Sequence, residues 1–352
     1  MPSRGLELLR QIEADNGVLY PLTSVRSEAF KKAAELFAAE GDPDQAARAR
    51  VEWLVFAFRE TEAFGSGNYF GPRYTKSDGS PFPDFYSLPP NTQQYLKARV
   101  AATNNPIHRA RYADFLWDKF RDAEAGAQAV PAYIECARLQ AARGDGNAAF
   151  RSIRRACHLA RQLRNGELQA MARDTALSLI ESMAGSSTAM YIPRVAESLM
   201  TLSDTLGPEQ RARLAELLEK ARASYVANRE FHLERGVLKS LRQLYKLSGD
   251  EEAERKAWLA EGESYEAEGD YKLRLDGLGG GPEVAAHLYQ LALTHFLNMG
   301  ETGKLEAVKK KMDAAHKRGP VNFAAFIETL RRSFTGGGQT GSSGTGPGVP
   351  GR

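Results

Sequence analysis

The stretch NPIHRARYADFLWDKFRD, residues 105–122, carries the pattern from which the fold can be predicted. Pro106 stands near the expected helix start, where the missing N–H of proline costs least. Apolar side chains then recur three or four residues apart, which places them on one face of a helix. The stretch therefore predicts an amphipathic helix. Its apolar face consists of Ile107, Ala110, Ala113, Leu116 (or Trp117) and Phe120.

The polar side of this helix carries charged residues beside an indole ring. Arg111 and Asp114 lie three residues apart, and so do Asp114 and Trp117. An arginine fork matches a carboxylate in geometry, so a structural ion pair explains the group without a ligand. The alternative is a site that binds an anion. The candidate binding residues in this helix are Arg109, Arg111, Asp114 and Trp117.

Similar amphipathic segments, separated by short turns that contain glycine, recur along the chain. Turns are expected at Gly41, Gly144, Gly249, Gly269 and Gly300. Small residues recur inside the segments, as in tetratricopeptide hairpins, where they let paired helices approach closely. The period is irregular, however. We predict an all-α fold: an irregular array of antiparallel helical hairpins, either a TPR-like α-solenoid or a helical bundle.

Four regions are expected from changes in composition. Residues 1–63 should form an N-terminal helical hairpin, and residues 64–91 a long loop rich in aromatic residues, Pro and Gly. Residues 92–334 should form the main helical-hairpin array. Residues 335–352 are rich in Gly and Ser and should form a disordered tail. Within the array, helices are expected at 130–142, 190–206 and 251–267, among others.

The loop at 64–91 is long for a compact domain, and such loops are either functional or disordered. Disordered segments contain few aromatic residues, whereas this one contains seven. We expect it to fold over the helices, either as a packed structural loop or as a surface that binds a ligand or partner. Candidate contact residues are Tyr69, Phe70, Tyr74, Phe85 and Tyr86.

Composition and charge exclude several classes of protein. The 352 residues are 42% hydrophobic and 26% charged, as in a soluble globular protein. The formal net charge of +3 is too small to indicate nucleic-acid binding by itself. No apolar run approaches the roughly 20 residues that span a bilayer, and residues 1–17 lack a secretory signal. Cys136 and Cys157 resemble reduced thiols. We therefore expect a cytoplasmic protein without a membrane partner.

The motif N-P-x-x-R-A-R-x-A-D-x-L-W, followed by an alanine-rich helix, resembles an uncharacterised bacterial helical family, domain of unknown function 7380. In that family the domain forms the N-terminal region of larger proteins that carry domain of unknown function 4209. The resemblance extends over about residues 20–180, the length expected for a domain. The matching residues are Asn105, Pro106, Arg109, Ala110, Arg111, Ala113, Asp114, Leu116, Trp117, Ala129, Ala132 and Tyr133.

Longer members of this family end in a HEPN-like helical module with an Arg-Asn…His ribonuclease signature. The nearest approach here is Arg164-Asn165, with Gln169 where the histidine should stand. Without an imidazole to move a proton near neutral pH, this chemistry lacks its usual acid and base. The resemblance therefore implies no ribonuclease activity for this chain.

A second candidate surface is the helix expected at 147–165, which contains no acidic residue. Its cations can contact phosphate groups or an acidic partner, but they can also face solvent or pair with acids on a neighbouring helix. A weaker cluster is 309–311. The basic patch consists of Arg151, Arg154, Arg155, His158 and Arg161.

No catalytic constellation is visible. The six histidines show no paired metal spacing, and two cysteines cannot form a Cys-rich zinc site. Cys157 and His158 are neighbours that point apart on a helix, which argues against a nucleophile–base pair. We expect no metal and no cofactor. The glycine-rich segment 276–282 follows no strand and is interpreted as a linker.

Three hypotheses about function remain. The first is a non-enzymatic scaffold or regulatory module that presents a concave helical surface to a protein or peptide. The second is a nucleic-acid-associated protein that is related to HEPN-type ribonuclease systems, including those of defence, and that lacks the catalytic motif. The third is an enzyme with a site assembled from the aromatic loop, Arg109, Arg111 and Asp114.

Overall fold

The computed structural model describes residues 3–15, 23–57, 88, 91–275 and 280–318. Within these ranges the chain forms fourteen α-helices, two short 3₁₀ helices and no strand, which confirms the predicted all-α array of hairpins. The helices are α1 (Arg4–Ala14), α2 (Thr23–Ala39), α3 (Pro43–Ala57), α4 (Thr92–Ala102), α5 (Pro106–Phe120), α6 (Ala123–Ala142), α7 (Gly146–Leu163), α8 (Gly166–Met183), α9 (Ile192–Met200), α10 (Pro208–Asn228), α11 (Phe231–Ser248), α12 (Glu251–Lys272), α13 (Pro282–Met299) and α14 (Thr302–Lys317).

The chain forms two compact units. The first contains residues 1–224 and 243–250, and the second contains residues 225–242 and 251–352. Helices α1 to α9 therefore belong to the first unit, and α12 to α14 belong to the second.

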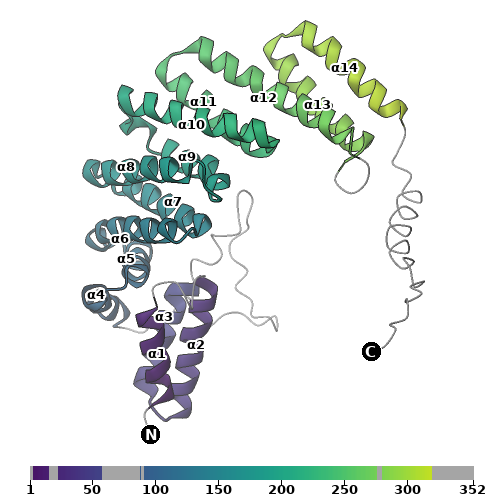
Figure 1. Cartoon of the computed structure of the whole chain (residues 1–352). Coiled ribbons are helices and arrows are strands. Elements are labelled where there is room, and N and C mark those ends of the chain that lie inside the picture. Colours follow the sequence, from purple (N-terminus) through teal and green to yellow (C-terminus); the bar gives the residue numbers. More distant parts are fainter. Residues whose placement is uncertain (1–2, 16–22, 58–87, 89–90, 276–279, 319–352) are drawn as a thin grey trace, which may run out of the picture. The chain divides into compact units, whose positions relative to one another are not determined.

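Helices α1, α2 and α3 pack side by side at the start of the first unit (Figure 1). Small residues of α2 and α3 let the two helices approach each other closely, and Phe37 fills the space beside them. The α2–α3 turn contains Gly41 with a φ of 78°, a conformation that glycine adopts without strain. This turn is one of those predicted from the sequence.

Helices α5 to α8 each begin at an Asn or Asp side chain that accepts a backbone N–H bond. Asn105 accepts from Ile107 and His108, and the three following helices are capped in the same manner. Pro106 occupies the first turn of α5, as predicted. The caps of α6, α7 and α8 are Asp122, Asp145 and Asn165.

Helices α6 to α9 form two layers (Figure 1). Sequential helices pack in pairs, and in addition α6 contacts α8 and α7 contacts α9. This contact between alternate helices is the arrangement of a helical-hairpin array. The side of α7 that faces the other helices is apolar, with Ile153, Ala156 and Leu159 fully buried.

In the second unit α13 packs between α12 and α14. Its core consists of small residues of α13 and α14 around Tyr289 and Phe296, which are fully buried. Two glycines of α12 allow these rings to come close. A Cβ atom at Gly262 would lie 2.7 Å from Phe296, and one at Gly269 would lie 2.6 Å from Tyr289.

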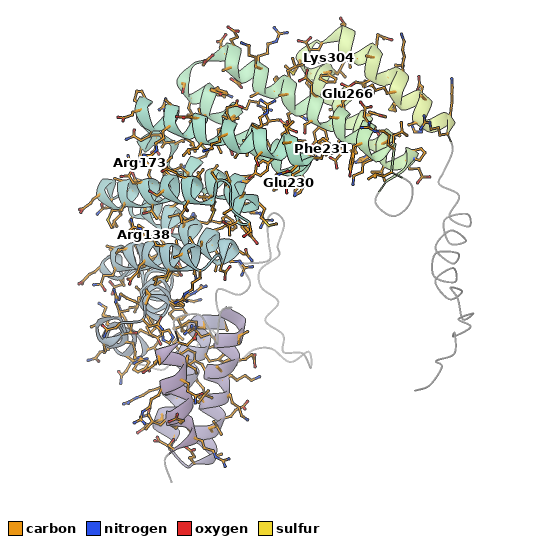
Figure 2. All side chains as sticks on the ribbon, in the orientation of Figure 1. Arg138, Arg173, Glu230, Phe231, Glu266 and Lys304 are labelled. Atoms are coloured by element: carbon orange, nitrogen blue, oxygen red, sulfur yellow. The ribbon has the colours of Figure 1, made fainter. Side chains whose placement is uncertain are left out.

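Acidic side chains of α12 connect it to both neighbours by ion pairs. Toward α11, Glu268 bonds Arg235 at 2.7 Å. Toward α14, Glu266 bonds Lys311 at 2.7 Å. Figure 2 labels Glu266 on α12 and Lys304 on α14, a residue that pairs with Glu263 at 2.5 Å. The charged helix α12 is therefore neutralised on two sides.

Three predicted boundaries were wrong. The helix expected at 251–267 continues to Lys272, because Gly269 provides a close contact and not a turn. The helix expected at 130–142 begins at Ala123 and accommodates Pro131 in its interior. The helix expected at 190–206 is divided into a 3₁₀ turn, α9 and a second 3₁₀ turn.

The aromatic loop and its candidate residues lie outside the described residues, and so does the expected C-terminal tail. In the described part of the chain, none of the helices combines the length and apolarity that crossing a membrane requires.

Candidate functional site

The carboxylate of Asp114 joins three helices. Asp114, on α5, is fully buried. Arg155 of α7 bonds it with two nitrogens, Nε at 2.9 Å and Nη2 at 2.6 Å, and the Tyr133 hydroxyl of α6 donates to it at 2.8 Å. Arg155 also reaches Asp118 at 3.1 Å. Burial by itself lowers the pKa of Arg155, but the charge of Asp114, its hydrogen bond and the nearby Tyr133 and Asp118 together outweigh burial and raise the pKa overall.

Arg109 and Arg111 point toward α6. Arg109 lies 3.9 Å from Glu135, and Arg111 lies over the ring of Tyr133 at 6.0 Å. The guanidinium group that forms the ion pair with Asp114 thus comes from Arg155, forty-one residues away. Each of the three candidates therefore contacts a side chain of α6 or α7: Arg109 contacts Glu135, Arg111 contacts Tyr133, and Asp114 contacts both Tyr133 and Arg155.

Trp117 lies half-buried where α5 meets the end of α7. Its indole nitrogen donates to the side chain of Gln162 at 3.2 Å, and Arg121 lies 5.9 Å from the ring. On its other side the ring packs against the backbone of Gly126, where a Cβ atom would lie 3.2 Å away. Trp117 therefore forms part of the α5–α7 surface.

The basic patch of α7 divides into one paired residue and an exposed row. The Arg155 side chain is 13% exposed and forms the ion pair with Asp114, so this member of the basic patch pairs with an acid on a neighbouring helix, one of the alternatives given by the sequence. Its neighbours at helical spacing remain exposed. We call the exposed row the α7 arginine face: Arg151, Arg154, His158 and Arg161.

The three arginines of the α7 arginine face have no acidic partner within the described residues. Elsewhere in the same unit, exposed arginines do find carboxylates, as Arg213 does with Glu181 at 2.5 Å. The weaker cluster at 309–311 differs as well, because Lys311 bonds both Glu266 and Asp270. The α7 arginine face is therefore the candidate docking surface.

A second polar cluster, which nothing in the sequence pattern indicated, lies buried among α1, α2 and α5. The Arg26 side chain is 1% exposed and bonds Asp15 at 2.7 Å. The same guanidinium lies 2.7 Å from Nε2 of His108, and Nδ1 of that ring lies 3.1 Å from the Tyr112 hydroxyl. Since a guanidinium can only donate, Nε2 accepts and Nδ1 carries the proton. Burial, followed by the charge of Arg26, holds the pKa of His108 well below its usual value.

This buried cluster anchors the end of α1. The last carbonyl groups of a helix have no intrahelical donors. Arg26 donates to the carbonyl oxygens of Ile12 and Asp15, and Asn105 donates to those of Glu13 and Asp15. Asn105 thereby caps the start of α5 with its oxygen and the end of α1 with its nitrogen.

A matching group lies around Glu52 of α3. Its carboxylate accepts from the Tyr95 hydroxyl at 2.6 Å and lies 2.8 Å from Nε of Arg99. Arg99 also bonds Glu13 of α1 and faces the ring of Tyr112. Burial raises the pKa of Glu52, while the Arg99 charge opposes that rise. Polar contacts thus connect α1, α3, α4 and α5 around the buried carboxylate of Glu52.

The described residues offer little for catalysis. Cys136 and Cys157 are buried, and burial raises the pKa of each thiol to about 12, which disfavours the reactive thiolate. Among the described side chains, no group of three or more His, Cys, Asp and Glu residues has an arrangement that could hold a metal ion.

The residues nearest to the HEPN signature form a helix junction. Arg164 ends α7 in a left-handed conformation with a φ of 51°, and Asn165 caps α8. Gln169 donates to the carbonyl of Ala160 at 3.3 Å. All three residues therefore have a structural role at the junction of α7 and α8: Arg164 through its backbone, and Asn165 and Gln169 through their side chains.

A family model matches residues 22–172 of the chain. It is the model of a domain of unknown function, DUF7380. This match confirms the resemblance inferred from the sequence. The matched region extends from the start of α2 into α8, and it contains the Asp114–Arg155 pair and the α7 arginine face.

No curated protein matches the chain. One similar solved structure is described as "Circular tandem repeat protein with novel repeat topology and enhanced subunit contact surfaces". It is 16% identical, and the match covers 94% of this chain and 72% of that chain. The TM-score is 0.18, too low to relate the two folds.

Proposed function

We propose that this protein is a non-enzymatic binding scaffold or regulatory module that docks an acidic protein partner on the α7 arginine face. The observation that carries this proposal is the row of exposed arginines without an acidic partner in the described part of the chain. Arginine is enriched in protein interfaces because its planar fork binds carboxylates with two hydrogen bonds. Complementary charge gives an interface its orientation and its specificity.

The support around the face is rigid. Arg155 fixes α7 to α5 through a buried carboxylate, and Trp117 bonds Gln162 two turns further along. A surface whose side chains rest on fixed helices loses less entropy when it binds. Tryptophan next to arginine is also a common composition of binding hot spots.

The test compares two variants that change the same number of charges. Arg151→Glu with Arg154→Glu reverses part of the α7 arginine face, while Lys309→Glu with Lys310→Glu reverses two exposed lysines on α14. Affinity capture from the native cell, with quantitative mass spectrometry, should show acidic proteins that bind the parent and the lysine variant but not the arginine variant. A set of captured proteins that is equal for both variants contradicts the proposal.

Nucleic acid is the second candidate, because phosphates also bind exposed arginines. One observation weighs against it. Single-stranded binders stack bases on exposed aromatic rings, whereas the one aromatic residue of α7, Phe150, is buried. Binding of a labelled single-stranded RNA at low salt decides the question. An affinity that falls about two decades per decade of salt, and that is lost in the arginine variant, favours nucleic acid over protein.

A further inference from the structure

A groove of about 400 Å³ lies between α6 and α8, in the layer opposite to α7 and α9. Its volume is within the range of about 300–1,000 Å³ that is typical of ligand sites. The buried side chains of Leu179 and Met183 form an apolar floor, and polar side chains surround it. The polar lining consists of Arg138, Thr175, Ser178, Ser182, Ser186, Ser187 and Thr188.

Arg138 is the one charged residue that lines the groove. It projects from α6, next to α8, which carries the labelled Arg173 (Figure 2). Its Nη2 donates to the Thr175 hydroxyl at 3.1 Å, which steers the guanidinium toward α8. The side chain is exposed, and no carboxylate among the described residues pairs with it. The remaining N–H groups of its fork are available to an incoming carboxylate.

The hydroxyl groups of α8 supply hydrogen-bond acceptors to the groove. Ser182 donates its proton to the carbonyl of Leu179 at 2.9 Å, so its oxygen retains lone pairs. Ser186 donates to the carbonyl of Met183 at 2.9 Å and accepts from the backbone N–H of Thr188 at 3.2 Å. The carbonyl groups at the ends of α6 and α8 already accept from the backbone, as that of Ala141 does from Gly144 and that of Ile180 does from Ala184. The groove therefore favours a ligand with a carboxylate for Arg138 and N–H donors for the exposed hydroxyl groups of α8.

We infer that this groove binds an extended acidic peptide segment, with an Asp or Glu side chain of the peptide on Arg138. A peptide backbone supplies N–H donors at regular intervals, and its small side chains can rest on Leu179 and Met183. A small-molecule site normally encloses most of its ligand. Here Arg138, Ser178 and Ser182 are exposed, so the groove covers one side of its occupant and leaves the other side in solvent, as a docked peptide segment requires. This inference rests on the proposed scaffold function and adds a second contact on the other layer.

The test uses the full chain and a phage-displayed library of random twelve-residue peptides. Selected peptides should share one acidic position. Their affinity, measured by fluorescence anisotropy, should fall at least tenfold in Arg138→Ala and in Ser178→Trp, which fills the groove. Arg138→Lys should give an intermediate loss, because it keeps the charge but not the fork. Circular dichroism of each variant establishes that the exposed substitutions leave the fold intact.

Arg151→Ala with Arg154→Ala separates this inference from the proposed function. Peptides that bind this variant normally but not Arg138→Ala support the groove. Peptides that need the α7 arginine face and bind Arg138→Ala normally overturn the groove and leave the scaffold proposal standing. A selection that enriches no acidic position, or no peptide, also overturns the groove, whatever the capture experiment shows.

Discussion

Asp114 connects α5 to α7 through a carboxylate that solvent does not reach. Its two oxygens receive Arg155 and the Tyr133 hydroxyl. An ion pair in such a position stabilises a fold only while both partners are present, because a lone buried charge is costly.

We predict that Asp114→Ala lowers the free energy of unfolding by about 3–5 kcal/mol, since it leaves Arg155 buried without its main partner. Urea unfolding followed by circular dichroism measures the loss. Asp118→Ala is the control, because the Asp118 side chain is 19% exposed and makes one contact to the same arginine. The control should lose at most about 1 kcal/mol. Equal losses in the two variants would contradict a central role for Asp114.

His108 makes the first unit sensitive to acid. The unfolded histidine has a pKa of about 6.5, and the folded one has a lower pKa because it is buried beside Arg26. Between these two values the unfolded chain binds a proton that the folded chain does not. Stability is therefore lost as the pH falls below about 6.5, with a slope of at most about 1.4 kcal/mol per pH unit.

His108→Gln should remove this slope between pH 6.5 and 5, because an amide accepts from Arg26 but does not titrate in this range. Hydrogen exchange of peptides from α1 and α5 measures how the local stability of these helices depends on pH. Burial raises the pKa of Glu52, so the titration of Glu52 makes the first unit less stable as the pH rises, opposite to the effect of His108. This contribution is the same in the parent and in His108→Gln. His295, whose pKa is also lowered, lies in the second unit. His295→Gln should leave the exchange slope unchanged, and a parent slope of zero would contradict the prediction.

Glycines in the helices of the second unit have different surroundings. Gly269 in α12 touches the ring of Tyr289, whose hydroxyl is held by Asp270 at 2.8 Å. Gly303 in the first turn of α14 has no heavy atom within 4 Å of the position that a Cβ would take. The same substitution at these two positions therefore separates packing from helix propensity.

Gly269→Ala should destabilise the second unit by about 1–3 kcal/mol, because the fixed ring cannot move away from the new methyl group. Gly303→Ala should be neutral or stabilising by up to about 1 kcal/mol, since alanine favours a helix. Thermal melting of both variants tests the pair. A gain in stability for Gly269→Ala would show that the Tyr289 ring moves away from the new methyl group, and it would contradict the prediction.

The same glycines show how far the sequence pattern could predict the fold. The turns at Gly41, Gly144, Gly249 and Gly300 were predicted, and each has a positive φ. Gly269 was predicted as a turn because a glycine before an aspartate looks the same whether it ends a helix or admits a neighbouring ring. Only the position of Tyr289 decides between the two.

The candidate site shows a similar limit. The sequence pattern identified the helix of Asp114 and the row of cations on α7, because both have helical spacing. It could not pair Asp114 with Arg155, since charges of either sign are common on exposed helices. The sequence pattern did not indicate that Arg26 and His108 are buried, because a polar residue can occupy the same position in the pattern whether it is buried or exposed to solvent. Their roles depend on contacts eighty-two residues apart.

Charge is distributed differently in the two units. In the second unit, α12 carries acids that pair with cations of α11 and α14, and several of these pairs are partly exposed. Lys304 and Glu263, for example, have side chains that are 36% and 46% exposed. In the first unit the pairs that connect α1 to α2 and α5 to α7, Arg26–Asp15 and Arg155–Asp114, are buried, whereas others such as Arg213–Glu181 are exposed.

We predict that raising NaCl from about 0.1 M to about 1 M weakens the packing of α12 against α14 more than that of α5 against α7. The added salt shortens the Debye length from about 10 Å to about 3 Å. The loss should be about 1 kcal/mol, because each exposed pair contributes little. Hydrogen exchange of α12 and α14, compared with that of α5 and α7, measures the difference. Lys311→Met should reduce the salt effect on α12, and an equal effect on the two pairs of helices would contradict this prediction.

The double role of Asn105 has a consequence for the order of folding. Its amide nitrogen holds the end of α1, while its oxygen starts α5, about ninety residues later in the chain. During synthesis, which proceeds from the N-terminus at about 5–20 residues per second, α1 to α3 leave the ribosome several seconds before Asn105, His108 and Tyr112 do. In that interval the guanidinium of Arg26 has no His108 beside it. The N-terminal helices therefore acquire their complete polar interior only after residues 105–112 have emerged.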